Sequence, residues 1–245
     1  VLFIPLTVPG DIAQVRVTRS EKRYAEAELV SLAKPSTLRV NPPCAVFGKC
    51  GGCSWQMLPY ELQWKTKWQG GQHALKKRLL DAQVPADLFP AESPYGYRNR
   101  IQLRVEGGKA GFFARKSHDL VVANRCEIAQ EPINAMIPDL TRRKATPERQ
   151  KVEIEVLENG QVRETWNERH GAAGFRQVHS AQNLHLRSWI SQHVTDTGPV
   201  LDLFGGDANL SRNVANRVSR VDVVDLGVPK QRDAELPEHV HFYRY

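Results

Sequence analysis

Three of the four cysteines lie within ten residues, in the stretch CAVFGKCGGC at positions 44–53, and the fourth is Cys126. Four thiolates suit either a tetrahedral zinc ion or an iron–sulfur cluster, and the spacing alone leaves both open beside unrelated buried thiols. Glycines in the loop let backbone N–H groups turn toward thiolate charge. Disulfides are disfavoured because no feature indicates a secreted chain. The loop therefore predicts a metal-type site.

The composition limits the class of protein. With 245 residues, 41% of them hydrophobic, the chain can form two or three compact modules with real cores. The formal charge of +7 favours an anionic partner such as a nucleic acid, although charge alone does not specify one. No apolar stretch approaches the roughly 18 residues that a membrane span needs. We expect a monomeric cytoplasmic protein without a membrane partner.

The first part of the chain is rich in expected strands and is followed by an expected helix. The runs VLFIPL, IAQVRVTRS and AEAELVSLA within residues 1–43 predict a small β-domain. Residues 59–83 predict a helix with a break or kink at Gly70–Gly71, since each glycine costs about 1 kcal/mol there. The helix positions expected to be buried are Leu62, Leu75, Leu79 and Leu80.

Residues 95–126 predict a β-meander, with apolar and polar residues alternating over 101–105 and a turn at Gly107–Gly108. Cations alternate with aromatic residues along it, a pattern that suits RNA phosphates and splayed bases but also an ordinary solvated face. The cationic candidates for RNA contact are Arg98, Arg100, Arg115 and Lys116, with Arg104 in the same strip.

The last part reads as a hairpin over 151–166 with Asn159–Gly160 at its turn, then a strand, a glycine-rich turn, a helix over 208–218 and a strand. Asp225 ends the second strand, about 20 residues past the glycines, where an acid can accept ribose hydroxyls. The pattern indicates either a Rossmann-like site for a nucleotide-type ligand or a plain βαβ turn.

Four stretches, CAVFGKCGGCSWQ, YGYRNR, GFFARKS and GFRQVH, resemble the RNA uracil-5-methyltransferase family, and more narrowly the bacterial enzymes that act on 23S rRNA. The resemblance implies an α/β protein with an all-β N-terminal part. Residues 1–43 would be an OB-like TRAM β-barrel whose start is missing, 44–150 a central iron–sulfur and RNA-binding domain, and 151–245 the first part of a Rossmann-like methyltransferase domain. It also implies a [4Fe–4S] cluster on Cys44, Cys50, Cys53 and Cys126.

The same resemblance implies S-adenosylmethionine as cofactor, bound by Gln177, Phe204, Asn209 and Asp225. Four positions depart from the family pattern. His179 stands for asparagine, Gly205 for cysteine, Ala208 for glycine and Asp225 for glutamate. Alanine at position 208 fits if its φ is negative, and the shorter Asp225 weakens a ribose contact without excluding it.

Methylation of uracil at C5 requires a thiolate that adds to C6 and a base that later removes the C5 proton. The resemblance assigns all four cysteines to the cluster, so we expect the catalytic nucleophile outside residues 1–245. The expected function is methylation of a uracil in RNA, with 23S rRNA as the favoured substrate. The alternative is a non-catalytic RNA-binding iron–sulfur protein with a degenerate methyltransferase fold.

Overall fold

The structure is a computed structural model that describes residues 1–76, 89–143, 147–168, 176–227 and 233–245. The chain divides into two compact units. The first comprises Val1–Pro90, Leu103–Glu127 and Asn134–Arg149, and the second comprises Ala91–Gln102, Ile128–Ile133 and Gln150–Tyr245. Among the described residues, no helix has the length and apolar character needed to cross a bilayer.

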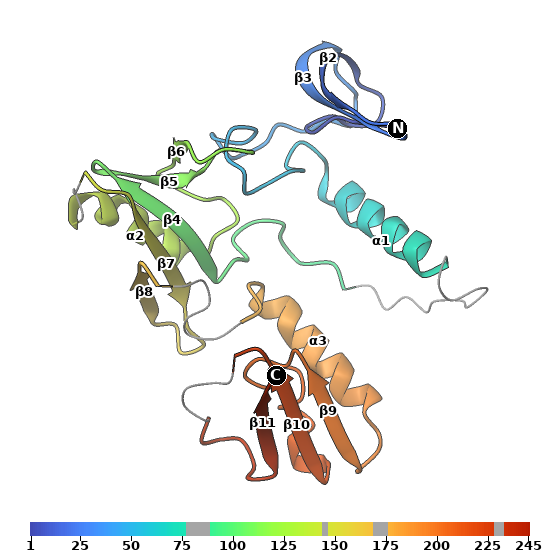
Figure 1. The fold of residues 1–245 in the computed structure, drawn as a ribbon, viewed down its shortest axis with the longest axis vertical. Helices are drawn as coiled ribbons and strands as arrows, with labels where there is room; N and C mark the ends of the chain where they lie inside the picture. The colour runs from blue at the N-terminus through green and yellow to red at the C-terminus, as the bar shows by residue number, and fades with distance from the viewer. Residues whose placement is uncertain (77–88, 144–146, 169–175, 228–232) are drawn as a thin grey trace. The chain divides into compact units, whose positions relative to one another are not determined.

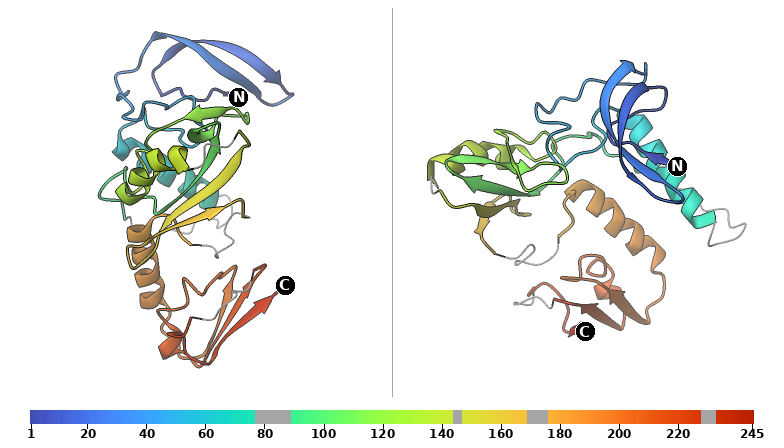
Figure 2. Two further views of the ribbon diagram at one scale, coloured as in Figure 1. Left: turned by 90° about the vertical axis from the view of Figure 1, so that its left-hand side faces the viewer. Right: turned by 45° about the horizontal axis from the view of Figure 1, so that its top comes forward.

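The N-terminal sheet contains β1 (Leu2–Phe3), β2 (Ile12–Ser20) and β3 (Ala25–Lys34) in the order β1-β3-β2. β2 and β3 form a long antiparallel ribbon, which Figures 1 and 2 show from three directions. The strand prediction for this part is confirmed, whereas closure into a TRAM barrel stays a prediction. The buried Asp11 carboxylate joins the loops at the base of the ribbon, accepting from the Val8 and Ser36 N–H groups at 2.7 and 2.9 Å and pairing with Arg39.

Helix α1 (Tyr60–Lys76) runs without a break through Gly70 and Gly71, so the expected break is wrong. A Cβ at either glycine would have no atom within 4 Å, and no residue of the helix is buried. No packed neighbour forces a bend, so the helical hydrogen bonds continue despite the low propensity of glycine. The burial expected of Leu75 is also wrong, because it is 36% exposed. Leu62 packs beside Met57 and Leu58, while Leu79 and Leu80 lie outside the described residues.

A sheet of five strands follows in the order β6-β5-β4-β7-β8. Its strands are β4 (Arg100–Glu106), β5 (Lys109–Phe113), β6 (Leu120–Val122), β7 (Gln150–Val156) and β8 (Val162–Trp166). The predicted alternation in β4 is confirmed, since Ile101, Leu103 and Val105 are all buried. The hairpin β7–β8 is confirmed too, with Gly160 at a φ of 81° in its turn.

Sequence reasoning missed helix α2 (Glu131–Arg143). Pro138 lies inside it, and an internal proline ordinarily argues against a helix. Ile133, Ile137 and Leu140 nevertheless form one stripe at helical spacing, and each is at most 1% exposed. Burial of that stripe outweighs the hydrogen bond that proline cannot make.

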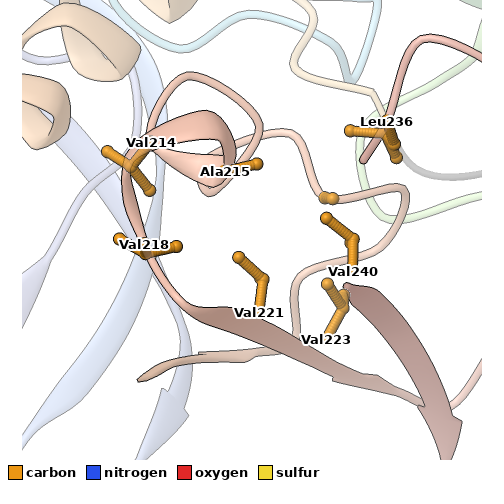
Figure 3. Close-up of a cluster of buried hydrophobic side chains, with 8 residues drawn as sticks. Val214, Ala215, Val218, Val221, Val223, Leu236 and Val240 are labelled. Atoms are coloured by element: carbon orange, nitrogen blue, oxygen red, sulfur yellow. The ribbon is translucent and has the colours of Figure 1, made fainter. Parts of the chain in front are cut away.

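The C-terminal part contains α3 (Ser180–His193) and a parallel sheet of β9 (Pro199–Leu203), β10 (Arg220–Asp225) and β11 (Val240–Arg244) in the order β11-β10-β9. Valines gather on one side of this sheet, as Figure 3 shows for Val214, Val218, Val221, Val223 and Val240, which pack with Ala208, Ala215 and Leu236.

The helix expected over 208–218 is wrong. The structure has turns there and a short 3-10 helix, η1 (Ala215–Arg217). Its hydrogen bonds are mostly of the i→i−3 type, such as Val214 N–H to the Ser211 carbonyl at 3.0 Å and Arg217 N–H to the Val214 carbonyl at 2.8 Å. Serine and asparagine in this stretch are weak helix formers, which favours the shorter, tighter turns.

Candidate functional site

The carboxyl ends of β9 and β10 meet at the turn Phe204–Ala208. The Asp225 carboxylate receives the Gly206 N–H at 3.1 Å through one oxygen and the Gly227 N–H at 3.0 Å through the other. It thereby fixes the turn after β9 and the loop after β10 in one place. α/β proteins commonly bind nucleotide-type ligands at the C-terminal edge of their parallel strands, often through a carboxylate there.

The turn adopts conformations that favour glycine but places other residues in them. Phe204 has a φ of 58° and Ala208 a φ of 65°, with Gly206 at 58° between them. A left-handed conformation costs a non-glycine residue about 1–2 kcal/mol. Alanine replaces glycine without strain only where φ is negative. Ala208 does not meet this condition.

Gly205 is required by close packing. A Cβ at this position would lie 2.6 Å from Cγ of Asp202 and 2.7 Å from Cγ1 of Val223, distances that real Cβ atoms do not reach. The cysteine that the methyltransferase family has at this position could not be accommodated unless the Asp202 or Val223 side chain or its strand moved. This departure is thus matched to the local packing of the chain.

A cavity of about 860 Å³ lies within the second unit and brings together Gln177 and Asn209, two of the four predicted cofactor residues. The Asn183 and Asn209 amides exchange two hydrogen bonds, each 2.8 Å long. Phe204, 72% exposed, and Asp225 do not line this cavity. Sequence reasoning missed Asn183, for which a lone asparagine within a helical stretch is only a weak signal.

Charged groups also line the cavity. Arg176 pairs with Glu155 at 2.9 Å, and Arg212 pairs with Asp233 at 2.8 Å. Burial raises the pKa of Asp207, although Arg212 and Arg176 act in the opposite direction. Amides, guanidinium groups and a carboxylate together suit a polar ligand with both donors and acceptors, such as a nucleoside.

His179 serves as the N-cap of α3. Its Nδ1 accepts a hydrogen bond from the Gln182 N–H at 3.3 Å, and its ring stacks on Tyr97 with centroids 4.7 Å apart. Burial lowers the pKa of His179, which favours the neutral ring that can accept this bond. An asparagine side chain caps helices in the same way, so histidine here preserves the capping contact.

The cysteine loop is attached to β5 through its backbone. Gly51 N–H donates to the Phe113 carbonyl at 2.9 Å, and Arg115 N–H donates to the Lys49 carbonyl at 3.1 Å. The Arg115 guanidinium also donates to the Cys53 carbonyl at 3.0 Å. The end of β5 thus helps to shape the loop, within which the Gly52 N–H also donates to Cys50 Sγ at 3.4 Å.

All four cysteines are free thiols of intermediate burial. Burial raises the pKa of Cys50, and negative charge on Cys53 and Cys44 would raise it further, so the three loop thiols share one environment. Asn134 holds the Cys126 backbone with two hydrogen bonds, of 2.9 and 3.2 Å. Among the described residues, however, no group of three or more His, Cys, Asp or Glu side chains is arranged to hold a metal ion. The donor set suits an iron–sulfur cluster chemically, and the four-thiol ligation stays a prediction.

The four predicted RNA-contact residues have different surroundings. Arg100 is 4% exposed and donates to Glu155 at 2.8 Å, so its guanidinium is engaged inside the second unit. Arg98 is half-buried, and Arg115 supports the cysteine loop. Lys116 is exposed and pairs with Glu26 at 3.2 Å. The alternation in the sequence placed Arg100 on a polar face. It could not show that Glu155 forms ion pairs with Arg100, Arg163 and Arg176.

Comparison with known proteins places the chain in a family. An uncharacterized RNA methyltransferase of Bdellovibrio bacteriovorus is 30% identical over 234 residues, which are 92% of this chain and 59% of that protein. The chain belongs to the same family as this relative. Uncharacterized RNA methyltransferases of Synechocystis and of Listeria innocua are 33% and 38% identical over 58% and 53% of the chain, which correspond to 32% and 30% of those proteins. The chain thus spans less than two thirds of the length of these relatives.

The fold has a counterpart among solved structures. The crystal structure of Pyrococcus abyssi tRNA (uracil-54, C5)-methyltransferase in complex with S-adenosyl-L-homocysteine matches with a TM-score of 0.71 and 19% identity, covering 99% of this chain and 74% of that one. At this identity the likeness establishes the fold alone. No protein-family model matches the chain.

Proposed function

We propose that this methyltransferase uses S-adenosylmethionine to methylate C5 of a uracil in RNA, with 23S rRNA as the favoured substrate. The observation that carries the proposal is the Bdellovibrio relative, an RNA methyltransferase that aligns with 92% of the chain. The uracil and its C5 position are supported by the stretches CAVFGKCGGCSWQ and GFRQVH, and by a fold shared with a uracil-C5 enzyme.

The proposed cofactor residues are Gln177, Phe204, Asn209 and Asp225. The Asp225 carboxylate already accepts two backbone N–H groups, and its remaining lone pairs suit ribose hydroxyls. The exposed Phe204 ring offers an apolar face to an adenine or a thioether. S-adenosylmethionine would supply the electrophilic methyl group, while these residues bind and orient it.

The remaining chemistry needs a thiolate that adds to uracil C6, so that C5 becomes nucleophilic, and a base that takes the C5 proton afterwards. The proposal assigns the thiolate to a cysteine outside residues 1–245, because it reserves the four thiols of this chain for a cluster. Within the chain, a cavity amide that is not assigned to the cofactor, such as that of Asn183, would orient the uracil ring by its hydrogen-bonding edge.

We also propose that Cys44, Cys50, Cys53 and Cys126 hold a [4Fe–4S] cluster that fastens the loop to the central domain. The support is the donor chemistry and the shared environment of the loop thiols. Anaerobic reconstitution with iron and sulfide should give about four irons per chain, the number that this cluster type contains. Cys126→Ser should lower that number and Ser54→Ala should not. Stoichiometric zinc with no sulfide-dependent absorbance would contradict the assignment.

Titration with S-adenosylhomocysteine tests the cofactor proposal. Wild type should bind at one saturable site, and Asp225→Asn should weaken binding about tenfold, the loss expected for one charge-assisted hydrogen bond. Asp222→Asn is the matched control, because Asp222 lies on the same strand and pairs with Arg220 at 2.8 Å. Equal affinity for wild type and Asp225→Asn would remove Asp225 from the site.

One observation favours a second function. Ala208 occupies a glycine conformation, with a φ of 65°, in the turn that would approach the cofactor. A site that no longer binds its ligand tolerates such a substitution, which fits a non-catalytic RNA-binding iron–sulfur protein. RNA binding without any S-adenosylhomocysteine binding would support this alternative over the enzyme.

A further inference from the structure

Two arginines lie against one aromatic ring in the first unit. The Arg104 guanidinium is 4.8 Å from the centroid of the Phe113 ring, and the Arg149 guanidinium is 5.7 Å from the same centroid. Arg104 projects from β4 and Phe113 from β5, whereas Arg149 precedes β7. Three separate segments therefore bring two positive charges to one ring.

The two guanidinium groups are held differently. Arg149 is fixed, because its Nε donates to Glu106 at 2.7 Å and its Nη1 donates to the His118 carbonyl at 2.9 Å. Arg104 is half-buried, and among the described residues no carboxylate lies within ion-pair distance of it. Burial lowers the pKa of Arg104, and the charge of Arg149 lowers it further. The protein thus keeps a partly desolvated cation beside a like charge without a compensating anion.

The surrounding charges do not neutralise this arrangement. Lys109 lies directly opposite Glu106 in the β4–β5 register and is exposed. Arg149 is paired with Glu106, and Lys109 adds an exposed cation at the same end of the β4–β5 hairpin as Glu106. Such a surplus of positive charge is relieved by an anion, and guanidinium groups bind phosphate oxygens through paired hydrogen bonds.

We propose that Arg104 and Arg149, positioned on the Phe113 ring, form a binding site for a backbone phosphate of the RNA substrate. The site rests on the proposed function for the identity of the RNA, and it adds Arg149, which the sequence pattern did not select, to Arg104 of the predicted cationic strip. Phe113 holds the Arg104 fork by a cation–π contact, so less side-chain freedom is lost when the phosphate binds.

The test is the salt dependence of binding of the chain to a short single-stranded RNA that contains uridines. Each phosphate contact adds about 0.7 to the slope of log affinity against log salt concentration for single strands. Arg104→Gln should weaken binding severalfold at low salt and reduce that slope by about 0.7. Arg104→Lys keeps the charge and should keep most of the slope while losing part of the affinity.

The matched control is Arg142→Gln on α2. Arg142 is an exposed arginine that pairs with Asp139 at 3.5 Å, so its replacement removes the same charge away from the Phe113 ring. It should leave the slope unchanged. Circular dichroism of each variant separates loss of fold from loss of contact.

The outcomes separate this inference from the proposed function. Two results would overturn the phosphate site and leave the methyltransferase proposal standing. One is that Arg104→Gln binds RNA with the wild-type salt slope. The other is that Arg142→Gln loses as much affinity and slope as Arg104→Gln. Wild type that binds neither RNA nor S-adenosylhomocysteine contradicts the proposed function itself. The site is supported if inorganic phosphate displaces RNA from wild type more readily than chloride does at equal ionic strength. Arg104→Gln should not show this preference for phosphate.

Discussion

The cysteine loop and the glycine turn are both short glycine-containing segments, yet they are stabilised in opposite ways. The cysteine loop is fixed mainly by backbone hydrogen bonds, including one from the Gly51 N–H to the end of β5. The turn Phe204–Ala208 is fixed by a side chain, Asp225, while its backbone adopts strained conformations at two non-glycine residues. The surroundings of the first segment shape it, whereas the second keeps its backbone conformation despite non-glycine residues at positions of positive φ.

This difference indicates where each segment tolerates change. In the turn, substitutions act through atomic collisions and backbone strain. In the cysteine loop they act through contacts with the sheet edge. The expected effects therefore rank with the tightness of the local contacts.

The largest effect is expected from Gly205→Ala in the turn. The new methyl would lie 2.6 Å from Cγ of Asp202 and 2.7 Å from Cγ1 of Val223, so these buried side chains or their strands must move. We expect a loss of about 3 kcal/mol in the free energy of unfolding, the upper range for overpacking. Urea denaturation measures it. Gly71→Ala is the control, because its Cβ meets no atom within 4 Å in mid-helix, and it should stabilise the chain by about 1 kcal/mol.

A smaller effect is expected from Gly51→Ala in the cysteine loop. Its Cβ would lie 3.2 Å from the Phe113 carbonyl oxygen and 3.4 Å from that of Ala114, which requires a shift of a few tenths of an ångström. We expect a cost of about 1 kcal/mol, since the hydrogen bond to Phe113 is weakened but not lost. Denaturation of the metal-free chain measures it. A cost as large as that of Gly205→Ala would remove the contrast between the two segments.

Ala208→Gly tests the strain in the turn. Relief of the left-handed conformation gains about 1–2 kcal/mol, and loss of a buried methyl and greater freedom of the unfolded chain cost a similar amount. The stability should change by less than about 1 kcal/mol. Ala215→Gly, at a buried position of η1, lacks the relief and should cost about 1.5 kcal/mol. Equal losses in the two variants would contradict strain at Ala208.

The smallest effect is expected from Asp207→Asn, and it depends on pH. Burial raises the pKa of Asp207 above its ordinary value of 3.8. The folded state therefore favours the protonated acid. The contribution of protonated Asp207 to the free energy of unfolding is complete below pH 3.8 and is lost as the pH rises through the folded pKa. The difference in the free energy of unfolding, Asp207→Asn minus wild type, should therefore be more positive near neutral pH than in acid. Thermal unfolding of both forms across this range measures it, and a constant difference would contradict the raised pKa.

Much of the fold could be predicted from the sequence, because strands and hairpins have local signals in the alternation of apolar residues and in the turn residues. Alternation identified β4, and Asn159–Gly160 identified the β7–β8 turn. Helix α2 was missed because Pro138 argues against a helix and only tertiary burial reveals its stripe. The helix expected after the glycine turn failed because hydrophobic spacing does not distinguish an α-helix from successive 3-10 turns.

The candidate site was predictable as a set of residues but not as a geometry. Gln177 and Asn209 share a cavity that Phe204 and Asp225 do not line, a division that linear spacing cannot show. The positive φ of Ala208 is likewise a property of the folded turn. The Arg104–Arg149 pair joins residues 45 positions apart along the chain (149 − 104) through one aromatic ring, beyond the reach of local patterns.

Methyl transfer by the protein isolated from its own cells tests the central claim most directly. The measurement is transfer of labelled methyl groups from S-adenosylmethionine to a 23S rRNA transcript, followed by nucleoside analysis. Our account predicts label in 5-methyluridine alone, and a covalent protein–RNA adduct when 5-fluorouridine replaces uridine. Label in any other nucleoside, or an unmodified transcript with no adduct, would contradict it.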